Sequence, residues 1–229
     1  MNLSPDSVVY WHVGYLTLNA TLAFTWAVML VLCAAAWLVT RRLDATARPS
    51  RWQILLEALV TGMRQQIMEI GHQAPGPYLP FVGTLFLYIA ASNLLAVVPG
   101  FMPPTGSLST TTALAVTVLV AVPLFSVAEQ GPLAYLKHYL EPSVFMLPFN
   151  LIGEISRTIA LAVRLYGNIM SGTLIIAILM GLVPFFFPIA IQALGLITGV
   201  VQAYIFAVLA MVYIASATTV QAHRDSSTD

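Results

Sequence analysis

Two arginines stand inside a stretch of the sequence that is otherwise strongly apolar. Arg157 and Arg164 fall within residues 148–182, where the hydropathy pattern predicts one long helix. A charged side chain near the centre of a membrane-spanning helix costs about 2.5 to 3.5 kcal/mol on insertion scales, so it requires a partner, a water-filled cavity or a function. Intramembrane charges of this kind mark substrate or ion pathways, and these two arginines are therefore the first candidates for chemistry.

Polar residues share one face of this predicted helix with the two arginines. Alternating steps of four and three residues separate the members of this polar stripe, which are Asn150, Glu154, Arg157, Leu161, Arg164, Asn168 and Ser171. We interpret Glu154 and Arg157, three residues apart, as a structural ion pair. No acidic residue stands between Glu154 and Asp225, so Arg164 lacks such a partner nearby. We therefore consider a partner for Arg164 on another subunit.

A second polar face is predicted on the helix over residues 186–220. Gln192, Gly195, Gly199 and Gln202 fall on this face, and the spacing of Gly195 and Gly199 lets another backbone approach closely. An amide at membrane depth requires a hydrogen-bond partner, and the guanidinium of Arg164 offers donors to Gln202. Close helix packing explains Gly195 and Gly199 without any role in transport. We assign the same packing role to Gly167 and Gly172.

The composition excludes several classes of protein. The chain is 59% hydrophobic and 8% charged, whereas soluble domains carry roughly a quarter charged residues. Residues 70–128 and 165–223 contain no Asp, Glu, Lys or Arg, and each run has room for two crossings of about 20 residues. The formal net charge is zero, and no Lys/Arg-rich run suggests nucleic-acid binding. The four histidines fall outside the predicted spans, so neither a metal site nor a cofactor is expected.

These patterns predict a single all-α membrane domain over residues 1–229. The five predicted spans cover residues 16–39, 78–98, 108–128, 148–182 and 186–220. The last two form a helix hairpin and are long enough to require a pronounced tilt. An amphipathic helix over residues 51–71 is expected to lie along the membrane surface with its apolar face in the headgroup boundary.

The distribution of positive charge predicts the orientation of the chain. Lys and Arg outside the spans gather on one side, at Arg41, Arg42, Arg48, Arg51, Arg64, Lys137 and Arg224. By the positive-inside rule this side is cytoplasmic, which places the amino terminus outside and the carboxyl terminus in the cytoplasm.

Several stretches resemble subunit a of the membrane sector of rotary F-type ATP synthases. LPFNLIGEISRTIALAVRLYGNIMSG (residues 147–172) is similar to the family's signature, in which an arginine stands in an R-L-x-G-N context; here that arginine is Arg164. VQAYIFAVLAMVYIASA (201–217) is similar to the last helix, with Gln202 at its glutamine. Residues 83–115 and 135–142 match as well, so the resemblance covers most of the chain beyond the first span.

The resemblance implies a non-catalytic, ion-translocating stator subunit in a bacterial inner membrane. Its implied partners are a rotating ring of c subunits, the b subunits of the peripheral stalk, the catalytic head and the lipid bilayer. Two half-channels would meet near Arg164, Asn168 and Gln202 and carry H⁺, with Na⁺ as the alternative ion. Candidate channel-lining residues are Asn93, Ser107, Glu129, Asn150, Glu154, Ser171, Thr173, Gln192 and Tyr204. Helix-end, turn or packing roles also explain several of these.

The sequence departs from the family pattern at three positions. Many members carry a glutamate where this chain has Thr173, a histidine where it has Gly195, and an aspartate where it has Ser107. One half-channel is therefore less acidic than usual, and the chain resembles the variant N-type branch.

Two other classes of protein remain as alternatives. A self-contained secondary transporter could use Arg164 to hold an anionic substrate, although the R-L-x-G-N segment has no second copy of the kind that internal repeats produce. An intramembrane hydrolase is disfavoured, because no H-E-x-x-H is present and no predicted span contains a histidine to activate Ser171.

Overall fold

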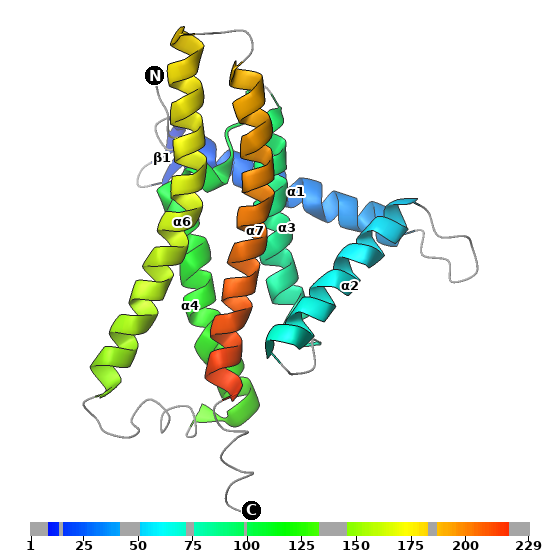
Figure 1. Cartoon of the computed structure of the whole chain (residues 1–229), viewed down its shortest axis with the longest axis vertical. Helices are drawn as coiled ribbons and strands as arrows, with labels where there is room; N and C mark the ends of the chain where they lie inside the picture. The colour runs from blue at the N-terminus through cyan, green and yellow to red at the C-terminus, as the bar shows by residue number, and fades with distance from the viewer. Residues whose placement is uncertain are drawn as a thin grey trace, which may run out of the picture.

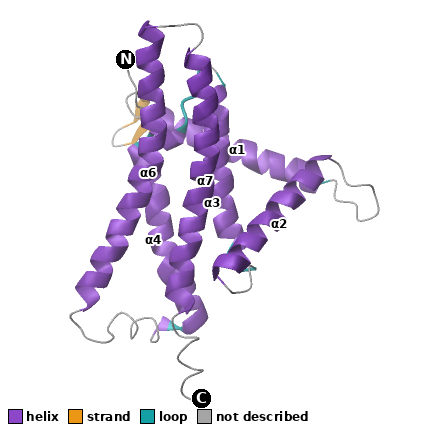
Figure 2. Ribbon diagram, in the orientation of Figure 1, coloured by secondary structure: helices purple, strands orange, loops and turns teal. Residues whose placement is uncertain are grey.

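The computed structural model describes residues 9–13, 16–41, 51–71, 76–98, 100–132, 146–182 and 187–219 of the 229-residue chain. Helices make up nearly all of this part (Figure 2). In chain order its elements are β1 (Val9–Val13), β2 (Leu16–Asn19), α1 (Ala20–Thr40), α2 (Arg51–Gly71), α3 (Leu79–Leu94), η2 (Leu95–Val97), η3 (Pro104–Gly106), α4 (Leu108–Gln130), α6 (Met146–Leu182) and α7 (Phe187–Thr219).

Five of the helices are long and apolar enough to cross a bilayer, which confirms the predicted all-α membrane fold. A spanning segment must satisfy its backbone polar groups internally, and a helix does so within one segment. The candidate spans are Ala20–Leu38, Leu79–Val97, Leu108–Glu129, Pro148–Leu182 and Ile189–Thr218. The fourth would be about 52 Å long at 1.5 Å per residue, against about 30 Å of hydrocarbon. This excess length supports the predicted tilt.

Helices α3, α4, α6 and α7 run side by side and form the body of the molecule (Figure 1). Helix α7 lies against α3, α4 and α6, while α4 also packs along α6. Helix α1 projects sideways from this bundle, and α2 returns diagonally toward it (Figure 1). The core contains Leu85 and Ile89 of α3, Leu161 and Leu165 of α6, and Phe206 of α7. Most apolar side chains on α6 and α1 face outward, as expected of helices that contact lipid or other subunits.

Proline and glycine set the boundaries of the middle spans. Pro80 occupies the first turn of α3, where its missing N–H leaves no helical hydrogen bond unmade. Gly100 and Gly131 have φ angles of 86° and 85°, which side chains other than glycine rarely adopt. Gly131 ends α4, and Gly100 lies in the turn after α3. Pro123 lies inside α4, a position at which proline commonly kinks a helix.

The amino-terminal part differs from the prediction in one element. Residues 16–19 form strand β2, which pairs antiparallel with β1, so α1 begins at Ala20 and not at residue 16. Helical periodicity cannot be read from so short an apolar run, because a strand explains it equally well. Asn19, in extended conformation, marks the transition into the helix.

Helix α2 is the predicted amphipathic helix, but protein covers part of its apolar face. Ile67 is buried in a cluster with Val82 of α3 and Met211 of α7. The opposite face keeps Glu57, Arg64 and Glu69 exposed. We expected this apolar face to rest in the headgroup boundary, but it packs partly on α3 and α7. An amphipathic pattern predicts an apolar face but does not specify what covers it.

The close approach of α3 and α7 at Gly199 leads to a prediction for Gly199→Ala. A Cβ atom there would lie 2.9 Å from Cβ of Asn93, too close for a real contact. We expect the resulting overpacking to destabilise the fold by about 1–3 kcal/mol, measurable as a lower midpoint of thermal unfolding of the detergent-solubilised complex.

Gly195→Ala is the matched control for this substitution. Gly195 stands one turn earlier on α7, and a Cβ atom there would meet no heavy atom within 4 Å. Equal stability of the two variants would show that the α3–α7 contact is not tight.

Candidate functional site

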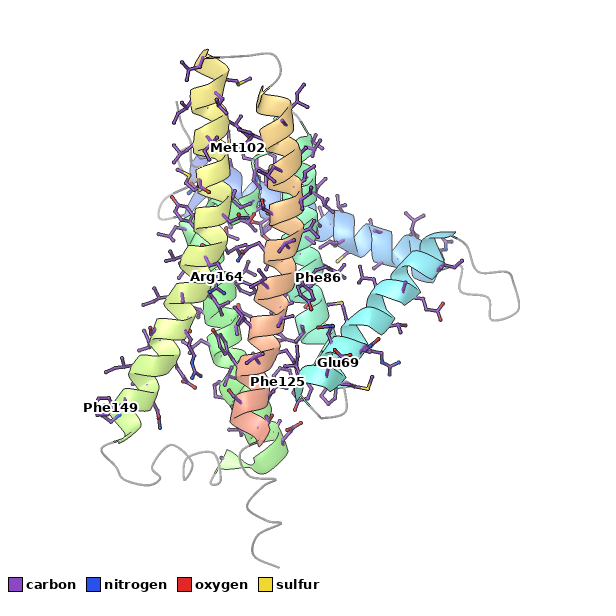
Figure 3. All side chains as sticks on the ribbon, viewed as in Figure 1. Glu69, Phe86, Met102, Phe125, Phe149 and Arg164 are labelled. Atoms are coloured by element: carbon purple, nitrogen blue, oxygen red, sulfur yellow. The ribbon has the colours of Figure 1, made fainter. Side chains whose placement is uncertain are left out.

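Arg164 lies about midway along α6 with its side chain exposed (Figure 3). The nearby Leu161 and Leu165 are buried in the core, where they are 2% and 0% exposed. Among the described residues no hydrogen bond, ion pair or ring contact involves Arg164. The guanidinium is thus presented at the surface of the chain, as expected of a cation whose partner is carried by another molecule.

A first cavity, of about 490 Å³, lies on the amino-terminal side of Arg164. Asn150, Glu154 and Arg157 of α6 line it together with Tyr213 and Ser216 of α7. Figure 1 shows the lower part of α6 leaning away from α7, and α4 closes the space between them. We refer to this space as the Glu154 cavity. It combines a carboxylate with a guanidinium, so it is suited to admit water and ions.

Arg157 makes a contact on α7 that we did not predict, and its predicted ion pair with Glu154 stays a prediction. Its Cζ atom lies 5.5 Å from the centroid of the Tyr213 ring on α7, in a cation–π arrangement. Glu154 and Arg157 share the cavity, but the guanidinium reaches across to the neighbouring helix. Sequence spacing identifies partners on one helix only, so it could not reveal Tyr213.

A second cavity, of about 280 Å³, lies on the carboxyl-terminal side of Arg164. Among its lining residues are Asn93 of α3, Asn168 and Thr173 of α6, and Gln192 and Gly195 of α7. We refer to it as the Asn168 cavity. Asn168 follows Arg164 by one turn, about 6 Å along the helix axis. The structure therefore brings together four predicted channel-lining or translocation residues from three helices.

Hydrogen bonds fix the polar groups on the α3 side of the Asn168 cavity. Asn93 donates from Nδ2 to the carbonyl oxygen of Gly199 over 2.8 Å, and its Oδ1 accepts from Thr105 over 2.8 Å. Gln192 donates to the carbonyl oxygen of Ala96 over 3.3 Å. Thr105 was missed in the sequence, where only its place in a proline-rich turn was apparent. Its fully buried hydroxyl holds the Asn93 amide in place.

A layer of buried apolar side chains, which we call the dry layer, separates the two cavities inside the chain. Leu161, Leu165 and Phe206 are each at most 2% exposed and belong to one apolar cluster. Leu161 lines the first cavity and Asn168 the second, so about 10 Å of α6 lies between them at 1.5 Å per residue. An ion therefore has no polar path from one cavity to the other through these residues.

Two amides near this layer lack hydrogen-bond partners. Nδ2 of Asn168 and Nε2 of Gln202 are buried atoms with no partner among the described residues. Gln202 is 7% exposed, whereas Arg164 is exposed, and no hydrogen bond joins the two in the described chain. Buried polar groups normally have partners, so these two N–H groups are exceptions within the described chain.

The remaining candidates have local contacts away from Arg164. Ser171 is exposed and donates to the Asn168 carbonyl, while Ser107, buried before α4, is 2.6 Å from Ser109. Tyr204 donates to Gln66 of α2 over 2.7 Å. Glu129 accepts a hydrogen bond from Tyr78, and burial, aided by Glu129, raises the pKa of the Tyr78 hydroxyl. These contacts connect helices and helix ends, and they do not join either cavity.

Among the four glycines assigned to close packing, Gly199 alone meets a crowded environment. Gly167, Gly172 and Gly195 would each accept a Cβ atom with no heavy atom within 4 Å among the residues considered. Gly172 and Gly195 instead line the Asn168 cavity, where a missing side chain leaves room.

The fold and the two cavities define a multi-pass integral membrane protein with polar and charged groups at membrane depth. The profile of the ATP synthase A chain family matches residues 22–215, and the chain belongs to this family. It is thus a non-catalytic membrane subunit of the F-type ATP synthase complex, in a family for which proton transport is typical.

Curated relatives match over nearly their whole length. ATP synthase subunit a 2 of Acaryochloris marina is 59% identical over 223 residues, which cover 97% of this chain and 95% of the relative. ATP synthase subunit a of Albidiferax ferrireducens is 59% identical over 218 residues, covering 95% and 94%. ATP synthase subunit a 1 of Chlorobaculum parvum is 58% identical over 218 residues, covering 95% and 96%.

The dry layer leads to a prediction for Leu165→Ser. A hydroxyl at this fully buried position attracts water and shortens the apolar barrier between the cavities. We expect vesicles containing the complex to lose an imposed ion gradient faster than wild-type vesicles when no ATP is present, as measured by decay of the gradient.

Ile178→Ser, on the exposed surface of the same helix and away from both cavities, controls for the added hydroxyl. It should leave the decay at the wild-type rate. A wild-type decay for Leu165→Ser in a fully assembled complex would mean that this layer is not the barrier.

Proposed function

We propose that the chain is the ion-translocating stator subunit of its ATP synthase. Two half-channels lead to Arg164 from opposite sides of the membrane, and a ring of c subunits carries the ion between them on membrane carboxylates. Protons are the coupled ion, with Na⁺ as the alternative.

The observation that carries this proposal is the position of Arg164 between two separate cavities, each with some polar side chains in its lining. The Glu154 cavity ends near Leu161 and the Asn168 cavity begins at Asn168, with apolar core between them. An ion that enters one cavity must leave the chain to reach the other. The exposed face of α6 at Arg164 is the place where a carrier on another subunit meets both.

The charge of Arg164 explains how the carrier could release its ion at this junction. A fixed cation in a low-dielectric environment favours ionisation of an opposing carboxylate, so an arriving c-subunit carboxyl releases its proton or Na⁺ there. The same charge repels a bare cation that moves directly between the half-channels. Each elementary charge that crosses 100 mV gains about 2.3 kcal/mol, so several ions must combine to drive the synthesis of one ATP.

Exposed apolar side chains support a large partner at this face. Ile159 and Val163 of α6, and Leu194, Ile197 and Val201 of α7, are all exposed. The ring of c subunits is proposed to pack against them. The b subunits and the catalytic head are proposed as further partners on the family resemblance, and positive charge supports a cytoplasmic carboxyl terminus.

A self-contained transporter is the other function considered. Both readings place a charged group at Arg164, but a transporter needs a closed substrate site around it. Arg164 is exposed and lies in neither cavity, which favours a partner-borne ligand.

The central test is Arg164→Ala in inverted vesicles that carry the whole complex. We expect ATP-driven ion uptake to fall to the level seen with an uncoupler, because no fixed cation discharges the carrier carboxylate. Sensitivity of wild-type uptake to protonophore or to sodium identifies the coupled ion.

Arg64→Ala, which removes an exposed arginine from α2, is the control and should retain uptake. Undiminished uptake by an assembled Arg164→Ala complex would refute the proposed mechanism.

A further inference from the structure

We infer that a pocket beneath α2 binds one acyl chain of a membrane phospholipid. This pocket, of about 270 Å³, lies where α2 meets α3 and α7 (Figure 1). We refer to it as the α2 pocket. It shares no lining residue with the Glu154 cavity or the Asn168 cavity, so it has no part in the proposed path of the ion.

Nearly all side chains that line the α2 pocket are apolar. Leu59 and Met63 come from α2, Phe86 from α3, and Val208 and Met211 from α7. Such a lining offers water too few hydrogen-bond partners, and apolar cavities of this kind stay dry. If the pocket were empty, these side chains would lose dispersion contacts on the side that faces it. A hydrocarbon occupant supplies the contacts that water cannot.

The α2 pocket is open to the exterior. Ala58 and Gly62 of α2 and Tyr204 of α7 line it, and all three are exposed. Because the chain is an integral membrane protein, lipid surrounds the apolar surfaces that no other protein covers. The other face of α2 carries the exposed Glu57 and Arg64, which are suited to water and headgroups. The pocket beneath this helix is therefore at the level where acyl chains begin.

One polar pair makes the lining amphipathic. The hydroxyl of Tyr204 donates to Oε1 of Gln66 over 2.7 Å, and both residues line the pocket. The amide nitrogen of Gln66 has two N–H donors, and the described part of the chain gives it no hydrogen bond. A phospholipid carries an ester carbonyl, which accepts hydrogen bonds, at the start of each acyl chain. This carbonyl suits the Gln66 donors while the chain fills the apolar space.

The volume of the α2 pocket favours a single acyl chain over a helix of a partner subunit. A helix is about 10 Å across, so one turn of about 5.4 Å fills roughly 400 Å³. This exceeds the space of about 270 Å³ between α2, α3 and α7. A linear hydrocarbon chain is one methylene thick and can follow a narrow space. The lining, the opening and the volume therefore agree on a lipid.

Photolabelling of the whole ATP synthase complex in lipid nanodiscs tests this inference. The probe is a phosphatidylcholine with a diazirine in the middle of one acyl chain. Mass spectrometry locates the adducts, and their yield is normalised to the total labelling of the complex. We expect adducts on Met63 and Phe86, which are half-buried at the pocket.

Gly62→Phe should abolish this labelling by filling the pocket with an aromatic ring. A Cβ atom at Gly62 would meet no heavy atom within 4 Å, so the helix accepts a side chain there. Labelling of Met63 and Phe86 should fall to the level seen without irradiation. Thr61→Phe is the matched control, because Thr61 is exposed on the same helix and lies outside the pocket lining. It should retain wild-type labelling.

Val208→Phe fills the pocket from α7 and repeats the test if the Gly62→Phe complex does not assemble. Wild-type labelling of the pocket in an assembled filling variant would overturn the inference. An unlabelled pocket in the wild-type complex would also overturn it, and this is the result expected if a partner subunit covers the site. Neither outcome bears on Arg164, so this inference and the proposed function can fail separately.

Discussion

A fixed positive charge at membrane depth is the constraint on which the rest of this structure depends. The guanidinium of Arg164 must avoid both lipid and the dry core, and burying it unpaired would cost several kcal/mol. Helix α6 buries Leu161 and Leu165 in the core and leaves Arg164 exposed, at a level between two cavities. The same packing of α6 creates the apolar barrier beside the charge, so exposure of the arginine and separation of the cavities have one structural cause.

The packing of α3 on α7 then determines the shape of one cavity. Asn93 bonds to the backbone of α7 at Gly199, where the absence of a side chain permits the approach, and Thr105 fixes the other end of the amide. These bonds use the polar atoms of Asn93 within the protein. The amide of Asn168, on the facing helix, has no such bond through Nδ2, so the two sides of the cavity have different roles. The α3 side holds the helices together through these bonds, and Nδ2 of Asn168 takes no part in them.

Much of the fold could be predicted because lipid imposes simple rules on sequence. Charge-free apolar runs predicted five spanning helices, and the three- and four-residue spacing predicted that Asn150, Glu154 and Asn168 share a face with Arg164. The sequence could not show that Leu161 divides this face between two cavities, because that depends on how α4 and α7 cover α6. The Arg157–Tyr213 contact and the covering of α2 by α3 and α7 are likewise tertiary contacts that no local pattern encodes.

The Glu154 cavity contains charged side chains and the Asn168 cavity does not, and this difference affects how Arg164 can act. A carboxylate in an access path binds cations and thereby concentrates them, but it also retains them and competes with the carrier that they must reach. Beside Arg164 such a carboxylate would form an ion pair with the guanidinium and weaken its effect on the carrier. Asn168 is one turn from Arg164, whereas Glu154 precedes it by ten residues, about 15 Å along the helix. A neutral lining close to Arg164 and a charged one farther away leave the guanidinium available to the partner's carboxylate.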